Sequence, residues 1–218
     1  LFNLLVHFKA DVFKDFRTVM FGGEAADNTA CNLCVTHGKP QHLINVYGPT
    51  ENGTYSTFYR IDSIQDGNIP IGNIVSNSEA YVLDNHQQLA AIGVIGELIV
   101  GGEGVAVGYR GRSDLTAEKF LPNTLSGKGQ LYRTGDLAWL RDDGMLMYAG
   151  RSDDQVKIRG FRIETREIEQ HILSYEGIQH CHVGAIKQGE NHFLCAWFVS
   201  DNTINSQELK NHLRAVLP

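Results

Sequence analysis

The sequence lacks the features of several protein classes. It contains no apolar run of about 18 residues or more, the length that a membrane-spanning helix needs. It also has no Walker A pattern, no internal repeat and no low-complexity segment. The apolar start, residues 1–8, has neither the basic segment nor the small-residue cleavage site of a secretory signal peptide. We therefore expect no membrane association and a cytoplasmic location.

Basic residues are few relative to acidic ones. Lys and Arg number 19 against 25 Asp and Glu, which gives a formal net charge of −6. This balance disfavours nucleic acid and anionic membranes as partners, because both bind basic surfaces. The 218 residues correspond to between one and two domains of about 150 residues each. Since the first residue is Leu1 rather than Met, we expect the chain to begin inside a longer polypeptide.

Cysteine is also scarce, with four in the chain. Cys31 and Cys34 form a C-x-x-C motif, but no second pair and no histidine cluster follow at the compact spacing of a zinc site. Residues 28–35 predict a helix with both cysteines on one face. We therefore interpret the cysteines as reduced thiols rather than as a zinc or redox centre.

Strands and helices alternate in the first part of the chain. Residues 17–21 form a short β-prone run that ends in two glycines, and a helix of about ten residues is expected from Asp27. A second short apolar run, residues 42–46, follows. This order predicts an α/β layer with its loops gathered at one edge of a sheet.

From about residue 75 the pattern changes to short strands separated by turns, which predicts a β-rich subdomain. The expected strands are residues 80–84, 97–100, 137–140 and 145–148, with one helix at 114–120. A small α+β unit follows, with strands at 155–159, 182–187 and 193–200 and helices at 164–174 and from Ser206. We expect a larger part, residues 1–152, and a smaller part, residues 153–218.

The stretch NVYGPTE (45–51) combines residue types that suit a nucleotide site. Tyr47 offers a stacking face, Thr50 can donate to a phosphate, and Glu51 can bind Mg²⁺, which prefers carboxylate and phosphate oxygens. A solvated turn after a strand would explain the same residues.

Three further segments carry weaker signals. In LYRTGD (131–136), Asp136 follows a glycine turn and could accept from both hydroxyls of a ribose, although a capped turn is the simpler interpretation. Residues 96–104 come near to G-x-G-x-x-G but lack its third glycine, so we interpret them as a strand and a tight turn. Residues 150–162 hold four cations that could neutralise a phosphate, or form a surface charge network with nearby glutamates.

In their order and spacing these motifs resemble the adenylate-forming superfamily, and specifically the amino-acid adenylation domains of nonribosomal peptide synthetases. The matching segments are residues 21–24, 45–51, 96–109, 132–137 and 150–169. The resemblance implies an α/β adenylate-forming fold. Residues 1–152 would be part of the large N-terminal α/β lobe, with the β-rich subdomain from about residue 75. Residues 153–218 would be the small α+β C-terminal lobe, truncated.

The resemblance implies that an amino acid is activated with ATP and Mg²⁺ as an aminoacyl-adenylate. The aminoacyl group then passes to the phosphopantetheine thiol of a peptidyl carrier protein domain. Alternatives are an acyl-CoA or aryl-acid ligase of the same superfamily, and a non-catalytic nucleotide- or carrier-protein-binding remnant. The family's phosphate loop, its amine-binding aspartate and its catalytic lysine have no counterpart in these 218 residues. We therefore expect the fragment by itself to be inactive or nearly so.

The resemblance also implies roles for individual residues. Those expected to contact the nucleotide or metal are Tyr47 stacking on adenine, Asn45 and Val46 beside it, the backbone of Gly22 and Gly23 on its other side, Asp136 on the ribose with Tyr148 and Arg151, Thr50 on phosphate, Glu51 on Mg²⁺, and Arg162 facing the nucleotide. Asp153 matches the hinge between the two lobes. The Gly160 loop would approach the pantetheine arm.

The resemblance places part of the substrate pocket in this chain. Its expected walls are Val19, Phe21, Val46, Thr54 and Tyr55. These side chains are uncharged and mostly apolar, and a charged substrate would need a buried partner. We therefore expect a neutral or hydrophobic amino acid.

Overall fold

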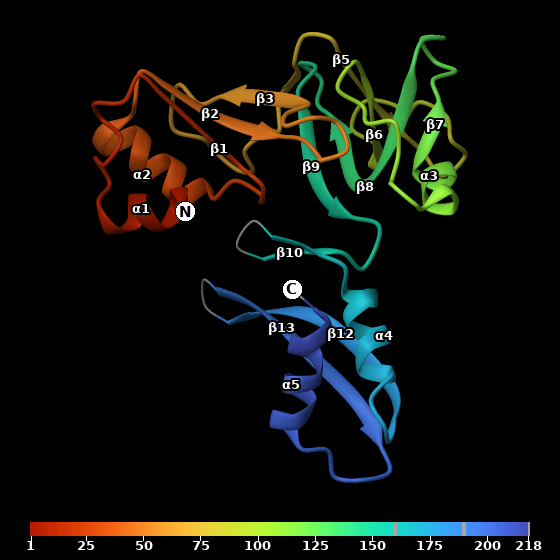
Figure 1. Cartoon of the computed structure of the whole chain (residues 1–218). Coiled ribbons are helices and arrows are strands. Elements are labelled where there is room, and N and C mark those ends of the chain that lie inside the picture. The colour runs from red at the N-terminus through yellow and green to blue at the C-terminus, as the bar shows by residue number, and fades with distance from the viewer. Residues whose placement is uncertain (159–160, 189–190, 218) are drawn as a thin grey trace. The chain divides into compact units, whose positions relative to one another are not determined.

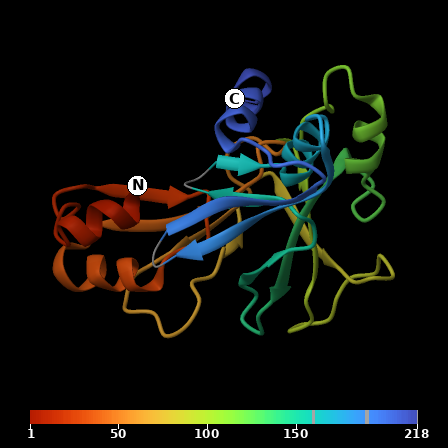
Figure 2. The same ribbon diagram turned by 90° about the horizontal axis from the view of Figure 1, so that it is seen from below.

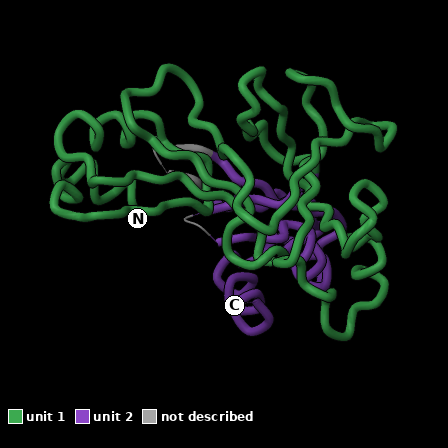
Figure 3. The backbone as a smooth tube through the Cα atoms, turned by 90° about the horizontal axis from the view of Figure 1, so that it is seen from above, with its two compact units in different colours: residues 1–152 green, residues 153–218 purple. Residues whose placement is uncertain are grey.

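A computed structural model describes residues 1–158, 161–188 and 191–217 (Figure 1). The chain divides into two compact units, Leu1–Ser152 and Asp153–Pro218 (Figure 3). Arg159 and Gly160, which belong to an expected strand and an expected pantetheine-facing loop, lie outside the described residues.

The first unit begins with a four-stranded mixed sheet in the order β1-β2-β3-β4. Its strands are β1 (Thr18–Gly22), β2 (His42–Tyr47), β3 (Thr57–Arg60) and β4 (Asn73–Ile74). β1 and β2 are parallel, and α2 (Asn28–Gly38) forms the crossover that such a pair requires. α1 (Phe2–Phe8) lies beside α2 (Figure 2). The predicted strand–helix–strand order is confirmed, whereas α1, β3 and β4 were not predicted.

Helix α2 begins and ends where its sequence requires. Oδ1 of Asp27 caps the helix by accepting from the Ala30 amide at 2.8 Å. Lys39 leaves the helix with an extended backbone, as expected before Pro40. Cys31 and Cys34 are both buried on the core-facing side of α2, which confirms that they share one face. Burial raises the pKa of the Cys31 thiol from 9.0 to about 12, with smaller contributions from Asp27 and Cys34, so Cys31 stays protonated at neutral pH.

A second, five-stranded antiparallel sheet completes the first unit. Its strands are β5 (Ser78–Leu83), β6 (Gly96–Gly102), β7 (Phe120–Pro122), β8 (Gln130–Leu140) and β9 (Leu146–Arg151), with α3 (Ser113–Lys119) before β7. β8 lies between β6 and β7 and also pairs with β9. The strands predicted for this region are confirmed in position, whereas β7 was not predicted.

β8 differs from its prediction in length. The sequence predicts a strand at 137–140 and places Asp136 after a glycine turn, but the strand runs from Gln130 to Leu140 without a break. Gly135 has φ +71° and lies where the pairing of β8 with β6 shifts register, between Glu97 and Ile99. The shift is a β-bulge in which Leu98 of β6 faces residues 134–136 of β8, so extra residues are inserted into the strand and the chain does not reverse. Asp136 therefore lies inside a sheet.

The part of the second unit that the structure describes contains two antiparallel strand pairs and two helices. The elements are β10 (Val156–Ile158), β11 (Phe161–Ile163), α4 (Thr165–Leu173), β12 (Ile178–Gln188), β13 (Asn191–Ser200) and α5 (Ser206–Val216). Its core is formed by Ile172, Ile178, Val183 and Leu209. The α+β content predicted for this part of the chain is confirmed. Among the described residues, no helix is both long and apolar enough to cross a membrane.

Candidate active site

Two buried residues from different sheets meet at the end of β2. The hydroxyl of Tyr47 donates to Oδ2 of Asp136 at 2.6 Å, and Nη1 of Arg151 donates to Oδ1 of Asp136 at 2.6 Å. Asp136 is 2% exposed and Tyr47 is 7% exposed. Both carboxylate oxygens are thus hydrogen-bonded, which offsets the cost of burying the charge.

Thr134 fixes the strand on which Asp136 stands. Its Oγ1 accepts from the Asp136 amide at 2.9 Å and donates to the Leu98 carbonyl of β6 at 2.5 Å. The Thr134 carbonyl accepts from Nη2 of Arg151 at 3.1 Å. The bulge at Gly135 is therefore held on both sides, and Asp136 has a fixed position.

Tyr47 is kept protonated by its surroundings. Burial, and then the neighbouring Asp136 carboxylate, raise the pKa of the Tyr47 hydroxyl well above its usual range. Its ring packs within the core of the second sheet. Stacking of this ring on a base, which the resemblance implies, therefore requires Tyr47 to become uncovered.

A second hydrogen-bonded group surrounds Glu51. Its Oε1 accepts from the hydroxyl of Tyr109 at 2.6 Å, and the hydroxyls of Tyr109 and Tyr132 lie 3.1 Å apart. Thr50, the preceding residue, is exposed. Neither Tyr109 nor Tyr132 was predicted from the sequence to have a role in the site. The signal that could have found them was their place inside the matching segments 96–109 and 132–137.

The arrangement around Glu51 suits a metal shared with phosphate. Within the described part of the chain, no group of three or more His, Cys, Asp or Glu side chains could hold a metal ion. Mg²⁺ does not need such a cage, because it keeps several waters and uses one or two carboxylates plus substrate phosphates. The Glu51 carboxylate and the neighbouring Thr50 hydroxyl supply hard oxygen donors of the type that Mg²⁺ accepts.

Gly22 and Asn45 are engaged within the protein. A Cβ atom on Gly22 would lie 2.1 Å from the carbonyl oxygen of Val46, so the pairing of β1 with β2 excludes any side chain there. Nδ2 of Asn45 donates to the Pro70 carbonyl at 2.8 Å. Gly23 follows β1 and is exposed.

The residues expected to wall the substrate pocket are divided between the two faces of the first sheet and a loop. Val19 and Phe21 pack towards the helices, and the Phe21 ring stacks on Phe2 with centroids 4.1 Å apart. Val46 pairs in register with Gly22, one residue beyond Phe21, so it faces the opposite side of the sheet. Thr54 and Tyr55 are exposed in the loop after β2.

The remaining predicted residues lie at separate places. Tyr148 is half-buried in β9 and packs against the core of the second sheet. Asp153 and Arg162 belong to the second unit, where Oδ1 of Asp153 accepts from the Gln155 amide at 3.3 Å. Nε of Arg162 lies 4.0 Å from Oε1 of Glu164, so the charge network considered for this segment is partly formed.

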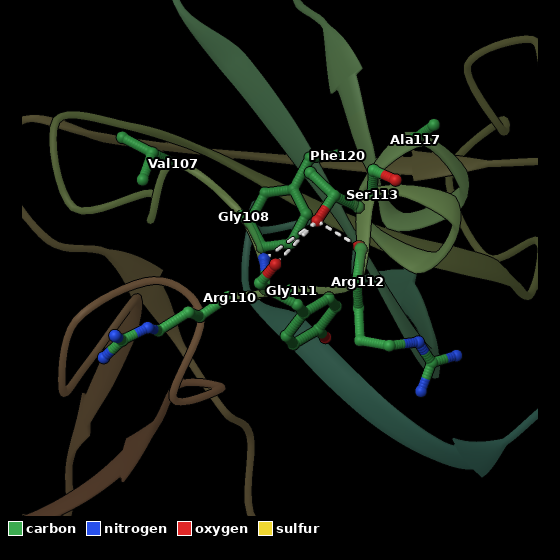
Figure 4. Close-up of a pocket in the computed structure, with 10 residues that line it drawn as sticks. Val107, Gly108, Arg110, Gly111, Arg112, Ser113, Ala117 and Phe120 are labelled. Atoms are coloured by element: carbon green, nitrogen blue, oxygen red, sulfur yellow. Dashed lines mark hydrogen bonds between the residues drawn. The ribbon is translucent and has the colours of Figure 1, made fainter.

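An open pocket lies beside α3 (Figure 4), lined among others by Val107, Gly108, Thr116 and Phe120. The side chains of Arg110 and Arg112 also border it but extend away from it in opposite directions. Its lining includes Tyr109, whose hydroxyl bonds Glu51, but none of the active-site residues predicted from the sequence. The pocket therefore adjoins the group around Glu51 and lacks the residues predicted to contact the nucleotide.

The contacts around Asp136 and Glu51 bring together acidic and aromatic residues of distant motifs in the first unit. The chain belongs to the AMP-binding enzyme family, whose model matches residues 1–110. The chain is similar over its whole length to gramicidin S synthase 2 of Brevibacillus brevis, with 40% identity over 219 aligned positions. It is equally similar to surfactin synthase subunit 3 of Bacillus subtilis, with 40% identity over 221 aligned positions.

The chain spans 5% of the gramicidin S synthase 2 polypeptide and 17% of surfactin synthase subunit 3. Among solved structures it resembles an artificially fused adenylation–PCP di-domain NRPS from Klebsiella oxytoca, with a TM-score of 0.83 and 29% identity. That match covers 97% of this chain and 40% of the other. The adenylate-forming fold predicted from the sequence is confirmed.

Proposed function

We propose that this chain is part of an enzyme that activates an amino acid with ATP. The products are an aminoacyl-adenylate and pyrophosphate, and the aminoacyl group then passes to the phosphopantetheine thiol of a peptidyl carrier protein. The observation that carries the proposal is the meeting of Tyr47 with Asp136, 89 residues apart in the chain. Because Thr50 and Glu51 lie three and four residues after Tyr47, the groups proposed to bind ribose, base and phosphate share one region of the first unit.

Each residue has a chemical task in this proposal. Asp136, oriented by Arg151, accepts from the ribose hydroxyls, and Tyr47 stacks on adenine after leaving Asp136. Asn45, Val46 and Tyr148 line the nucleotide, with Gly22 and Gly23 on the other face of the base. Thr50 donates to phosphate and Glu51 binds Mg²⁺. When bound at Glu51, Mg²⁺ would offset the charge that develops on the leaving pyrophosphate.

The second unit takes part through motion in this proposal. Asp153 is its first residue, and we assign it as the hinge between the larger lobe, residues 1–152, and the small lobe, residues 153–218. Arg162 then reaches the nucleotide during adenylation. Hinged closure of a lobe around a substrate is a common way to complete a catalytic site.

The proposed substrate is a neutral or hydrophobic amino acid. The side chains implied for the pocket, Val19, Phe21, Val46, Thr54 and Tyr55, carry no charge. A charged substrate would have to be buried without a partner among them, which is costly. The need for ATP and for a carrier protein places the enzyme in the cytoplasm in this proposal.

Acid-dependent ATP–pyrophosphate exchange tests the proposal, on the full natural polypeptide that carries this chain. The panel contains neutral and charged amino acids, aryl acids and fatty acids. We expect exchange with one neutral amino acid, and its loss in Glu51→Gln. Glu79→Gln is the matched control, because Glu79 also accepts from a tyrosine hydroxyl but lies in β5. Exchange only with aryl or fatty acids would assign the chain to the acid–CoA ligases, and exchange with no acid would contradict catalysis.

A further inference from the structure

The hydroxyl of Tyr109 joins the Glu51 carboxylate to the core of the second sheet. It lies 2.6 Å from Oε1 of Glu51 and 3.1 Å from the hydroxyl of Tyr132, which is fully buried at 0% exposure. A carboxylate only accepts, so the single proton of Tyr109 goes to Glu51. The Tyr132 hydroxyl must then be the donor to Tyr109. The two hydrogen bonds therefore run in one direction, from Tyr132 to Tyr109 and from Tyr109 to Glu51.

Tyr109 is itself held in place by the helix that follows it. Oγ1 of Thr116 in α3 accepts from the Tyr109 amide at 2.9 Å. The Tyr109 ring meets Phe120 edge to face, with centroids 5.3 Å apart and an interplanar angle of 76°. Both the backbone and the ring of Tyr109 are thus fixed, so its hydroxyl is presented to Glu51 at a defined position.

The backbone of Glu51 is attached to the same segment. Its carbonyl accepts from the Ala106 amide at 2.8 Å, and Asn52 forms an isolated β-bridge with Val105. Residues 105–109 therefore hold Glu51 both at its backbone and at its carboxylate. A glutamate side chain that is ordered in advance loses less rotamer entropy when it binds a ligand.

We propose that Tyr109 is a positioning residue for Glu51, and that its hydroxyl fixes the carboxylate in the orientation that receives Mg²⁺. This inference rests on the proposed function, in which Glu51 binds the metal. A residue that hydrogen-bonds a metal-binding carboxylate orients that carboxylate towards the metal. Loss of such a residue typically weakens metal binding or activity about 10- to 100-fold.

Tyr109→Phe tests the proposal, because it removes the hydroxyl and leaves the ring on Phe120. The matched control is Tyr81→Phe, which removes a hydroxyl that donates to Glu79 at 3.1 Å in β5. The readout is Mn²⁺ binding in the presence of ATP, measured by electron paramagnetic resonance on the full natural polypeptide, with Glu51→Gln as the reference for loss of this site. The Mg²⁺ dependence of exchange is measured alongside.

We expect Tyr109→Phe to weaken Mn²⁺ binding on the order of 10-fold and to raise the Mg²⁺ requirement equally, with an unchanged KM for the amino acid. Tyr81→Phe should change neither. Wild-type Mn²⁺ affinity in Tyr109→Phe, or an equal loss in Tyr81→Phe, would overturn the proposal. If Glu51→Gln also keeps wild-type affinity, the metal role of Glu51 fails as well. Should Tyr109→Phe not fold, Tyr132→Phe must show a smaller weakening, and wild-type affinity there overturns the proposal.

Discussion

The hydroxyl of Tyr47 at the end of β2 donates to Oδ2 of Asp136 in the middle of β8, across a distance of 2.6 Å. This bond joins the two sheets of the first unit. In the proposed function both residues contact the nucleotide, Tyr47 at the base and Asp136 at the ribose, but here they are bonded to each other. Binding of a ribose at Asp136 therefore competes with a bond that the protein already makes.

Tyr47→Phe is expected to lower the free energy of unfolding by about 1.5–3 kcal/mol. The variant removes one of the donors to a buried carboxylate, and hydrogen bonds to charged groups contribute about that much. Urea unfolding at neutral pH measures the change. Tyr81→Phe, whose hydroxyl bonds a carboxylate at a half-buried site, should cost less. A loss below about 0.5 kcal/mol for Tyr47→Phe would show that the bond does not stabilise the fold.

Asp136→Asn is expected to reduce discrimination between ATP and 2′,3′-dideoxy-ATP. If Asp136 accepts from the ribose hydroxyls, the wild type should prefer ATP by about 10-fold or more, since each hydrogen bond to a charged group contributes about 1.5–3 kcal/mol. The side-chain oxygen of the new asparagine can still accept from Arg151, so the fold should persist. Competition binding of the two nucleotides to both proteins checks this, and equal discrimination in both would contradict the ribose role.

Gly135→Ala is expected to cost about 1–2 kcal/mol and to weaken ATP binding. Gly135 has φ +71°, where a Cβ atom is strained, and the bulge it forms positions Asp136. Gly144→Ala is the matched control: it has φ +85° and open space around it, but lies in the turn before β9. Urea unfolding and ATP titration should show similar destabilisation in both variants and weaker ATP binding in Gly135→Ala alone. Equal ATP binding in both would mean that the bulge does not position Asp136.

Stability is expected to fall as the pH rises above about 9, in part because of Cys31. Below pH 9 both the folded and the unfolded chain keep this thiol protonated. Above it the unfolded chain loses the proton, while the folded chain keeps it up to a pKa of about 12. The free energy of unfolding then decreases, at most by about 1.4 kcal/mol per pH unit for one group. Urea unfolding at pH 8, 9.5 and 10.5 should give a shallower decrease for Cys31→Ser, and an unchanged slope would contradict the burial effect.

The parts of the fold that were predicted are those with a local signal. Short apolar runs identified β1 and β2, and the cap at Asp27 placed the start of α2. β4 was missed because it has two residues, too few for a pattern. β8 was predicted too short because a glycine followed by an aspartate favours a turn as much as a bulge. Only the pairing of this segment with β6 determines whether it forms a turn or a bulge.

The candidate site shows the same division between local and distant information. The motifs named Tyr47, Glu51 and Asp136, but nothing local indicates that Tyr47 bonds Asp136 or that Tyr109 bonds Glu51. Such contacts depend on how two sheets pack. The faces of Phe21 and Val46 likewise follow from the parallel register of β1 and β2, which the separate runs do not encode.

The close approach of Gly22 to β2 has a consequence for evolutionary comparison. An added methyl group would collide with the Val46 carbonyl oxygen whether or not a base lies nearby, since the obstacle is the neighbouring backbone. A descendant of this chain that had lost all use for ATP would still have to keep glycine at position 22 in order to fold. A glycine at this position therefore reflects the requirements of strand pairing. By itself it does not distinguish a catalytically active protein from an inactive one.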